Sequence, residues 1–251
     1  MNSIEKSIKI LNYLSDAGRN VGITELSLQL SFPKSTVHRI LNTLLKHSLA
    51  NQDKETLKYQ LGLQIIKYSN SFYNSFDFRQ VAKPILKDVC GETKLTAFLT
   101  TWYNGKGICI DSITPSLKAN THLFVEIGKE MPFNCAASAK VLLAFRQPQE
   151  IKSIINRKSL YKYTPKTIID PKKLEKHLIE IKNNGFAFCN EELEEGAKAI
   201  SAPVKNINDE VIASITVTGL SKKLSKKNIK KFTTILVNSS QKLSKKLGYK
   251  K

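Results

Sequence analysis

The sequence lacks any long run of apolar residues. No stretch approaches the roughly 18 apolar residues that a membrane-spanning helix needs. The first residues, MNSIEKSIKIL, also carry an acidic side chain and a helical period where a secretory signal would need an uninterrupted apolar segment. We therefore expect a soluble cytoplasmic protein without a membrane partner.

Cysteine and histidine are scarce, with four residues of each type. The cysteines are scattered without CxxC spacing, which argues against a zinc knuckle, and disulfides are not expected in a reducing compartment. An acidic run has no accompanying histidine and predicts a solvated loop rather than a metal site (Glu191, Glu192, Glu194 and Glu195). Neither a metal ion nor a cofactor is expected.

The chain has 251 residues, of which 41% are hydrophobic, enough for one large domain or two of ordinary size. Its net charge of +19 is unevenly distributed, since residues 221–251 hold eleven lysines and no acidic residue. These lysines have two interpretations. Either they form the solvated face of a terminal helix over about residues 225–247, which we favour, or they attract DNA phosphates without sequence preference.

The segment from Ile23 to Leu45 predicts two short helices joined by a tight turn. In the second helix, apolar residues recur with the helical period and form one stripe (Val37, Ile40, Leu41, Leu44 and Leu45). The opposite side carries polar side chains that can donate to phosphates and base edges. An outer face of this kind is either simply solvated, which periodicity alone favours, or the reading face of a helix-turn-helix, which the flanking sequence supports.

The flanking sequence favours a winged helix. An amphipathic helix precedes the pair, with Ile4, Ile8, Leu11 and Leu14 on its apolar side and Gly18 as its stop. Thr24 is expected to cap the second helix, and Pro33 to occupy the first position of the third. Two strands are expected afterwards, over 49–52 and 57–61, with Leu57, Tyr59 and Leu61 on one face.

A connecting helix is expected next, over residues 64–77, with Leu63, Ile66, Phe72 and Phe76 as its apolar residues. The remaining pattern predicts helices over 78–89, 136–145, 171–183 and 225–247. Strands are expected over 95–103, 107–113, 122–127, 199–204 and 211–218, with a tight hairpin at Asn104-Gly105. Strands in sequence-adjacent pairs with helices at both ends predict an antiparallel sheet covered by helices, an α+β domain.

Residues 128–140, GKEMPFNCAASAK, form a run of small residues that leads into a helix. Small residues allow close approach of a ligand, and a helix N-terminus offers free N–H groups to a carboxylate or another small anion. A tight loop that needs small residues only for packing is the other interpretation.

Five segments, in a fixed order along the chain, carry a family resemblance. SIEKSIKILNYL, ITELS and PKSTVHRILNTL resemble the DNA-binding domain of the IclR family of bacterial transcriptional regulators. MPFNCAASAKVLLAF and the stretch from YTPKTIID to AISAPV resemble its effector-binding domain. The resemblance implies a winged helix-turn-helix over 1–63, a linker helix over 64–77 and a GAF-like α+β effector-binding domain over 78–251. It also implies dimers, which can pair into tetramers.

The resemblance assigns roles to residues of this chain. In a ligand-responsive regulator of this kind, one set would contact an operator in double-stranded DNA: Lys34, Ser35, Thr36, His38, Arg39, Asn42 and Lys46. A second set would enclose a small-molecule effector, expected to be a small organic acid: Ala137, Ser138, Cys189, Ala197, Ala199, Thr216 and Thr218. Two positions depart from the family. Cys189 stands where Asp or Ser is usual, and Ala139 where Gly is usual, which puts the identity of the ligand in doubt.

Two other functions compete with this hypothesis. One is a GAF-like small-molecule enzyme with Cys109, Cys135 or Cys189 as nucleophile. It would need a base nearby, and only His122 and His177 lie in the C-terminal part, in no catalytic motif. The other is a partner-binding module built on the sheet, without any ligand. We favour a regulator that is not an enzyme.

Overall fold

The computed structural model describes residues 2–74, 78–115, 123, 125–157 and 160–250. The chain forms two compact units, residues 1–76 and 77–251, and each is described by itself. None of the helices in these ranges is both long and apolar enough to cross a lipid bilayer.

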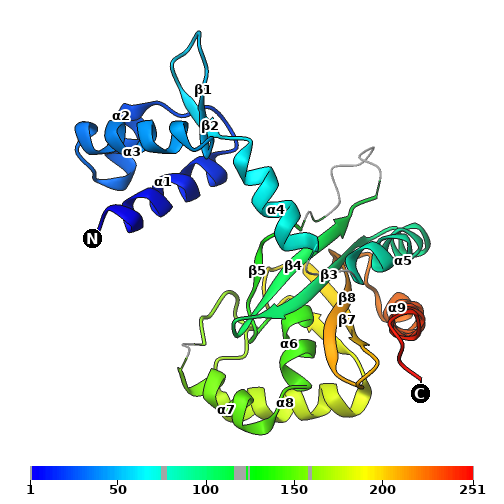
Figure 1. Ribbon diagram of the computed structural model, residues 1–251. Coiled ribbons are helices and arrows are strands. Elements are labelled where there is room, and N and C mark those ends of the chain that lie inside the picture. Colours follow the sequence, from blue (N-terminus) through cyan, green and yellow to red (C-terminus); the bar gives the residue numbers. More distant parts are fainter. Residues whose placement is uncertain (1, 75–77, 116–122, 124, 158–159, 251) are drawn as a thin grey trace. The chain divides into compact units, whose positions relative to one another are not determined.

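The first unit is a winged helix-turn-helix (Figure 1). Helices α1 (Ser3–Ala17), α2 (Ile23–Leu30) and α3 (Lys34–Lys46) precede an antiparallel hairpin of β1 (Ala50–Gln52) and β2 (Tyr59–Leu61). An isolated bridge between Val21 and Tyr59 adds a third segment to the hairpin. Helix α4 (Gln64–Asn74) follows. The core between the helices is one apolar cluster that includes Leu26, Val37 and Leu41.

The helix ends confirm part of the prediction. Asn2 begins α1 with a capping box, since its side chain accepts from the Glu5 N–H while the Glu5 carboxylate accepts from the Asn2 N–H, and Gly18 ends the helix in a left-handed conformation. Thr24 was wrongly expected to be a cap. Gly22 is the N-cap of α2, so Thr24 already lies inside the first turn.

Pro33 is the N-cap of α3 rather than its first helical residue, because Lys34 begins the helix. Leu57 was expected on the same face of the hairpin as Tyr59 and Leu61. This prediction is wrong, because Leu57 is exposed. Asp53 accepts hydrogen bonds from the N–H and hydroxyl of Thr56, and this turn continues into Leu57, whose φ of 56° is outside the strand region.

Apolar side chains remain exposed on two helices of this unit. On α1, Ile10 and Leu14 are buried in the core. Ile4 and Ile8 were also expected on the buried side, but they are 72% and 50% exposed. Ile66 of α4 and Leu63 just before it are exposed as well. The side chain of Phe72 and residue Phe76 lie outside the described residues.

The second unit is an α+β domain built on an antiparallel sheet. The strands are β3 (Thr96–Tyr103), β4 (Lys106–Ile113), β5 (Glu130–Met131), β6 (Ala187–Asn190), β7 (Ala197–Lys205) and β8 (Val211–Leu220). Their order is β5-β4-β3-β8-β7-β6. Asn104 and Gly105 both have positive φ, as a two-residue hairpin between β3 and β4 requires, so the predicted turn is confirmed.

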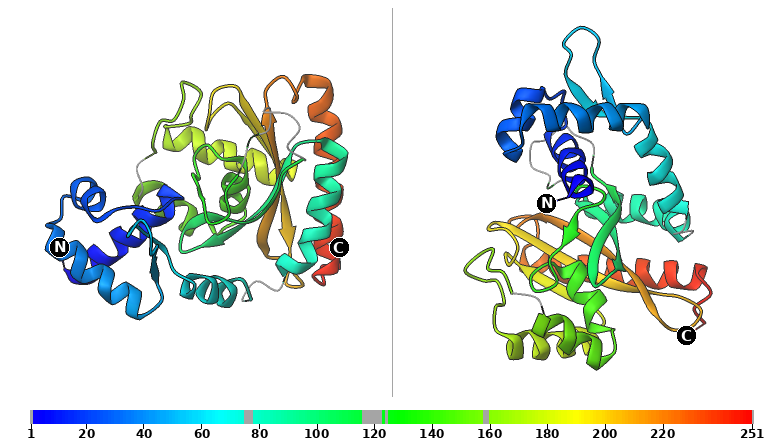
Figure 2. Two further views of the ribbon diagram at one scale, coloured as in Figure 1. Left: turned by 90° about the horizontal axis from the view of Figure 1, so that it is seen from above. Right: turned by 60° about the vertical axis from the view of Figure 1, so that its left-hand side comes forward.

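Helices cover both faces of this sheet (Figures 1 and 2). Helices α5 (Phe78–Thr93) and α9 (Lys226–Lys246) pack side by side on one face. Helix α6 (Ala137–Ala144) packs on the other face and is buried along its whole length, with α8 (Pro171–Asn184) outside it. Helix α7 (Pro148–Arg157) adds Ile154 and Ile155 to the same core.

Three predictions for this unit fail. Residues 123 and 125–127 are not a strand, and the strand in this region is β5; His122 lies outside the described residues. Helix α7 and strand β6 were not predicted. Strand β6 has four residues and shows too few alternations to be recognised in the sequence, whereas the helical spacing of Ile151, Ile154 and Ile155 in the ten-residue α7 was overlooked.

Candidate functional site

Helix α3 has one buried face and one polar exposed face. Val37, Ile40, Leu41 and Leu44 are buried in the core of the first unit, as their spacing predicts. Arg39 and Asn42 are exposed on the other side. The leucines and valine thus anchor the helix while its polar face stays open to a partner.

Of the seven side chains that were expected to contact DNA, Thr36 is half-buried. The other six are exposed: Lys34, Ser35, His38, Arg39, Asn42 and Lys46. The Asn42 amide lies 3.4 Å from Nδ1 of His38, one helical turn away. Arginine, asparagine and serine on one open helix face can donate to the base edges of a major groove.

A cavity in the second unit lies between α6, the sheet and the segment before β5. Its volume is about 90 Å³, several times the roughly 10–15 Å³ that one water molecule needs. All the residues of the expected effector set line it (Ala137, Ser138, Cys189, Ala197, Ala199, Thr216 and Thr218). The structure therefore brings together residues that lie up to 81 positions apart in the sequence, between Ala137 and Thr218.

The strand register explains this convergence. Cys189 of β6 pairs with Ala199 of β7, and Ala199 pairs with Thr218 of β8. Paired residues point to the same face of a sheet, so these three side chains form a row across it. Thr216 lies two positions from Thr218 and shares that face, which α6 covers.

The hydroxyl groups of the cavity differ in what they can offer a ligand. Thr216 donates to Ser201 Oγ at 2.8 Å, and Thr218 donates to the Lys198 carbonyl at 3.1 Å. Both can therefore only accept a further hydrogen bond. The Ser138 hydroxyl is buried without a hydrogen-bond partner in the structure, so its donor is available.

Helix α6 begins at this cavity without a side-chain cap, because its N-cap residue is Ala136. Its first N–H groups consequently have no side-chain acceptor. Lys129 and Lys198 also line the cavity, together with Glu194. None of the three was expected to line the cavity, although Lys129 lies in the 128–140 segment and Glu194 in the acidic run that the sequence singled out.

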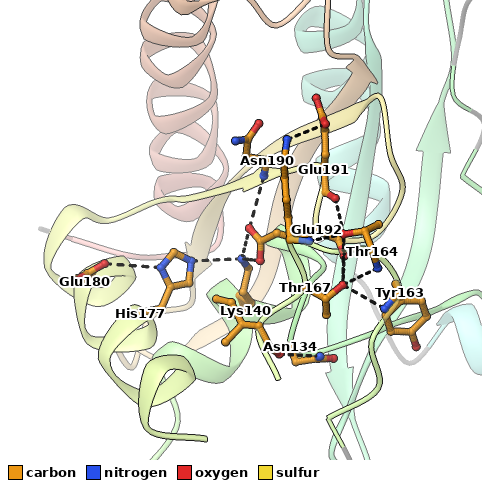
Figure 3. A network of polar contacts seen from close by, with 12 residues as sticks. Asn134, Lys140, Tyr163, Thr164, Thr167, His177, Glu180, Asn190, Glu191 and Glu192 are labelled. Atoms are coloured by element: carbon orange, nitrogen blue, oxygen red, sulfur yellow. Dashed lines mark hydrogen bonds and ion pairs between the residues drawn. The ribbon is translucent and has the colours of Figure 1, made fainter. Parts of the chain in front are cut away.

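A buried ion pair joins helix α6 to the turn after β6, and both elements contribute residues to the cavity lining (Figure 3). Lys140 of α6 is 0% exposed, and its Nζ donates to both carboxylate oxygens of Glu192, at 2.9 and 2.7 Å. The same Nζ lies 3.2 Å from Nε2 of His177 on α8. Thr167 donates to the Glu192 carbonyl at 2.6 Å. The turn after β6 is thereby fixed against α6 at Lys140, two residues after Ser138.

The expected solvated acidic loop is therefore wrong for Glu192, which is buried because Lys140 compensates its charge. The Glu191 carboxylate accepts hydrogen bonds from Lys166 and Ser221, which lower its pKa to about 2. Glu194 and Glu195 are exposed. The described residues contain no cluster of His, Cys, Asp and Glu suited to a metal ion.

The cysteine side chains are poor nucleophiles in this structure. Burial raises the pKa of Cys109 and of Cys135 to about 12, and it raises the pKa of Cys189 as well. At neutral pH all three are neutral thiols, whereas a nucleophilic cysteine reacts as the thiolate. These environments do not favour the cysteine-enzyme hypothesis.

Ala139, the second departure from the family pattern, lies inside α6 and not in a loop. It does not line the cavity. A Cβ atom added at Gly107 of β4 would lie only 3.0 Å from the Cβ of Ala139. The glycine thus leaves room for the alanine methyl group. Of the two departures, only Cys189 contributes to the surface that a ligand would meet.

The His177 side chain should make the stability of the second unit depend on pH. Burial, and next the charge of Lys140, lower its pKa below the usual 6.5, although Glu192 and Glu180 oppose this effect. Below about pH 6.5 the unfolded chain binds the proton more readily than the folded chain does. The free energy of unfolding therefore decreases as the pH is lowered through this range. Urea unfolding between pH 5.5 and 7.5, followed by the fluorescence of Trp102, the single tryptophan, would measure it.

His177→Gln should flatten this pH dependence, because glutamine can accept from Lys140 and does not titrate. His38→Gln, in the first unit, is the matched control and should leave it unchanged. An equal slope in wild type and His177→Gln would contradict the assignment.

Family models cover nearly the whole chain. The model for the IclR helix-turn-helix domain matches residues 3–54, and the model for the bacterial transcriptional regulator IclR C-terminal matches residues 71–245. Among curated proteins, the regulator XynR of Escherichia coli is 28% identical and is covered over 97% of its length, with 98% of this chain. The regulator KdgR of Escherichia coli is also 28% identical, covered over 94%, with 98% of this chain.

Solved structures agree with the family models. The IclR protein of Thermotoga maritima is 25% identical, with a TM-score of 0.82 over 99% of this chain and 100% of that one. An IclR homologue of Microbacterium hydrocarbonoxydans, solved with 4-hydroxybenzoate, is 17% identical and shares the fold, with a TM-score of 0.83 over 98% of this chain and 99% of that one. The chain belongs to the IclR family of bacterial transcriptional regulators, with an N-terminal DNA-binding helix-turn-helix and a C-terminal effector-binding domain.

Proposed function

We propose that this protein binds an operator as a dimer or tetramer in the cytoplasm and that a small organic acid in the α6 cavity switches its affinity for DNA. The observation that carries the effector half is the Ser138 hydroxyl, which is buried beside the uncapped start of α6 and has no hydrogen-bond partner among the residues that the structure describes. A carboxylate there would accept from Ser138 and from helix N–H groups, and Lys129 and Lys198 would add positive charge.

The DNA half of the proposal uses the exposed face of α3. Arg39 and Asn42 would read base edges, with Ser35, Thr36 and His38 beside them, and Lys34 and Lys46 would contact phosphates. In this proposal residues 1–63 bind DNA, 64–77 link the units and 78–251 hold the effector. The exposed Ile4 and Ile8 of α1 and Leu63 and Ile66 at α4 support self-association through the first unit and the linker.

Small carboxylates should raise the melting temperature of the protein, because a ligand that binds only the folded state stabilises it. We expect a shift with at least one of pyruvate, 2-oxoglutarate, benzoate and 4-hydroxybenzoate, measured by differential scanning fluorimetry, and a matching change in DNA affinity. The fourth probe is chosen because the Microbacterium homologue was solved with it.

Ala199→Phe should abolish this shift by filling the cavity, with DNA affinity in the absence of carboxylate retained. Ser138→Ala leaves the cavity open and should weaken binding of the same carboxylate by about 1.5–3 kcal/mol, the contribution of one hydrogen bond to a charged group. No shift with any of the four compounds, or an undiminished shift in Ala199→Phe, would refute the effector half of the proposal.

A further inference from the structure

A band of lysines lies on the C-terminal helix and on the turn just before it, and we call it the lysine face: Lys222, Lys223, Lys226, Lys227, Lys230, Lys231, Lys242, Lys245 and Lys246. All are exposed except Lys223, which is half-buried. The apolar residues between them, such as Phe232, Leu236 and Leu243, are buried, and the helix packs beside α5 on the sheet (Figure 2). The prediction of an amphipathic terminal helix is confirmed.

Few carboxylates compensate the positive charge of the lysine face. Among the described residues, one ion pair to it is present, between Lys242 Nζ and Asp88 Oδ2 of α5 at 3.6 Å, and both side chains are largely exposed. Six of the nine lysines lie in the ten positions 222–231 as three adjacent pairs, each pair four positions after the one before. Like charges at a spacing of four repel one another on a helix.

The position of these six lysines makes the repulsion stronger. They surround the N-terminus of α9, the positive end of the helix dipole, and the first turn holds no acidic residue. A helix that needed only solubility would gain stability from glutamate there. The lysines at this end thus cost folding free energy that a bound polyanion would offset.

A hollow next to the lysine face carries the same charge. It has a volume of about 550 Å³ and lies between the end of α5, the end of β4 and the turn before α9. Three lysines line it, Lys87 and Lys94 from α5 and its end and Lys223 from the lysine face, and none of the described residues that line it is acidic. Ammonium groups from two separate elements therefore converge where an anionic group can sit.

We propose that the lysine face and this hollow bind the phosphates of duplex DNA without sequence preference, so that the second unit has a DNA contact of its own. The proposal rests on the membership of the chain in a DNA-binding family. A second copy is a poor occupant, because it would bring the same positive charge to a two-fold interface. A lipid surface would require large apolar side chains exposed among the lysines, and the described segment 222–246 has none.

The test uses the full chain and a 30-base-pair duplex of random sequence, with affinity measured by fluorescence anisotropy between 50 and 300 mM NaCl. The variant replaces Lys222, Lys223, Lys226, Lys227, Lys230 and Lys231 by glutamine. We expect about tenfold weaker binding at 100 mM salt. We also expect the slope of log K against log salt to decrease in magnitude by about two to three, since each lost phosphate contact removes about 0.9.

The matched control removes the same charge from α7, α8 and the loop between them, with glutamine at six exposed lysines: Lys152, Lys162, Lys172, Lys173, Lys176 and Lys182. It should change the slope by less than one. A third variant, with glutamine at Lys87, Lys94 and Lys223, should have an intermediate effect. Circular dichroism checks that each variant is folded.

Equal losses in the two sixfold variants would overturn the proposal, because they would reflect net charge alone. The proposal would also be overturned if the wild-type protein did not bind the random duplex at 50 mM salt. It would be overturned as well if the lysines mediated binding to vesicles of phosphatidylserine and phosphatidylcholine but not to DNA. Arg39→Ala separates this proposal from the operator half of the proposed function, since it should lower operator preference and leave the salt dependence on random DNA nearly unchanged.

Discussion

Replacing Lys140 by methionine should lower the free energy of unfolding of the second unit by about 3–5 kcal/mol. Methionine has a similar length but leaves the Glu192 carboxylate buried without its cation, and it removes a donor to His177. An uncompensated buried charge is among the most costly defects in a folded protein, because the charge loses its hydration and gains nothing in return. Urea unfolding followed by Trp102 fluorescence reports on this unit, since Trp102 lies in β3.

Two further variants distinguish a lost charge pair from lost packing. Lys140→Met combined with Glu192→Leu removes both charges, and it should recover most of the stability because no buried charge is left unpaired. Lys166→Met breaks the exposed pair with Glu191 and should cost about 1 kcal/mol or less, as surface ion pairs do. A double variant as unstable as Lys140→Met would show that the buried pair is not the cause.

Arg39→Ala should weaken operator binding by about 1–3 kcal/mol, or between about 5-fold and 150-fold, relative to random DNA, if Arg39 contacts a guanine in the major groove. The side chain is on the exposed face of α3, opposite the buried Val37 and Leu41, so alanine should not disturb the core. The operator would first be selected from a random library with the wild-type protein, and affinities measured by anisotropy and footprinting.

Arg19→Ala and Lys46→Ala are the controls for this substitution. Arg19 is also in the first unit but pairs with Glu25, away from α3, and its removal should leave DNA affinity unchanged. Lys46→Ala should weaken operator and random DNA alike, as loss of a phosphate contact does. An unaltered operator preference in Arg39→Ala would remove Arg39 from the reading face.

The prediction of the first unit from sequence was successful because its contacts are local. In α3 the apolar period by itself separates the buried Val37 and Leu41 from the exposed Arg39 and Asn42. The errors lie at Thr24, Leu57, Ile4 and Ile8. In each case a cap, a turn or a neighbouring helix, and not the residue's own pattern, decides which groups are buried.

The candidate cavity was found by a different kind of reasoning. Spacing pointed only to the small residues before α6, and the other lining residues came from the family resemblance. The pairing of Cys189 with Ala199 and of Ala199 with Thr218 is a matter of strand register, which no local pattern contains. Lys129 and Lys198 look like ordinary surface lysines until the fold places them at the cavity.

The sequence alone determined the helix-turn-helix, the antiparallel α+β character of the second unit and the family, since periodicity and ordered motifs are written along the chain. Only the tertiary structure decided that Glu192 is buried on Lys140, that Ser138 keeps a free donor and that three lysines share one hollow. The physical reason is that burial and charge compensation depend on groups distant in the sequence, 52 positions apart for Lys140 and Glu192.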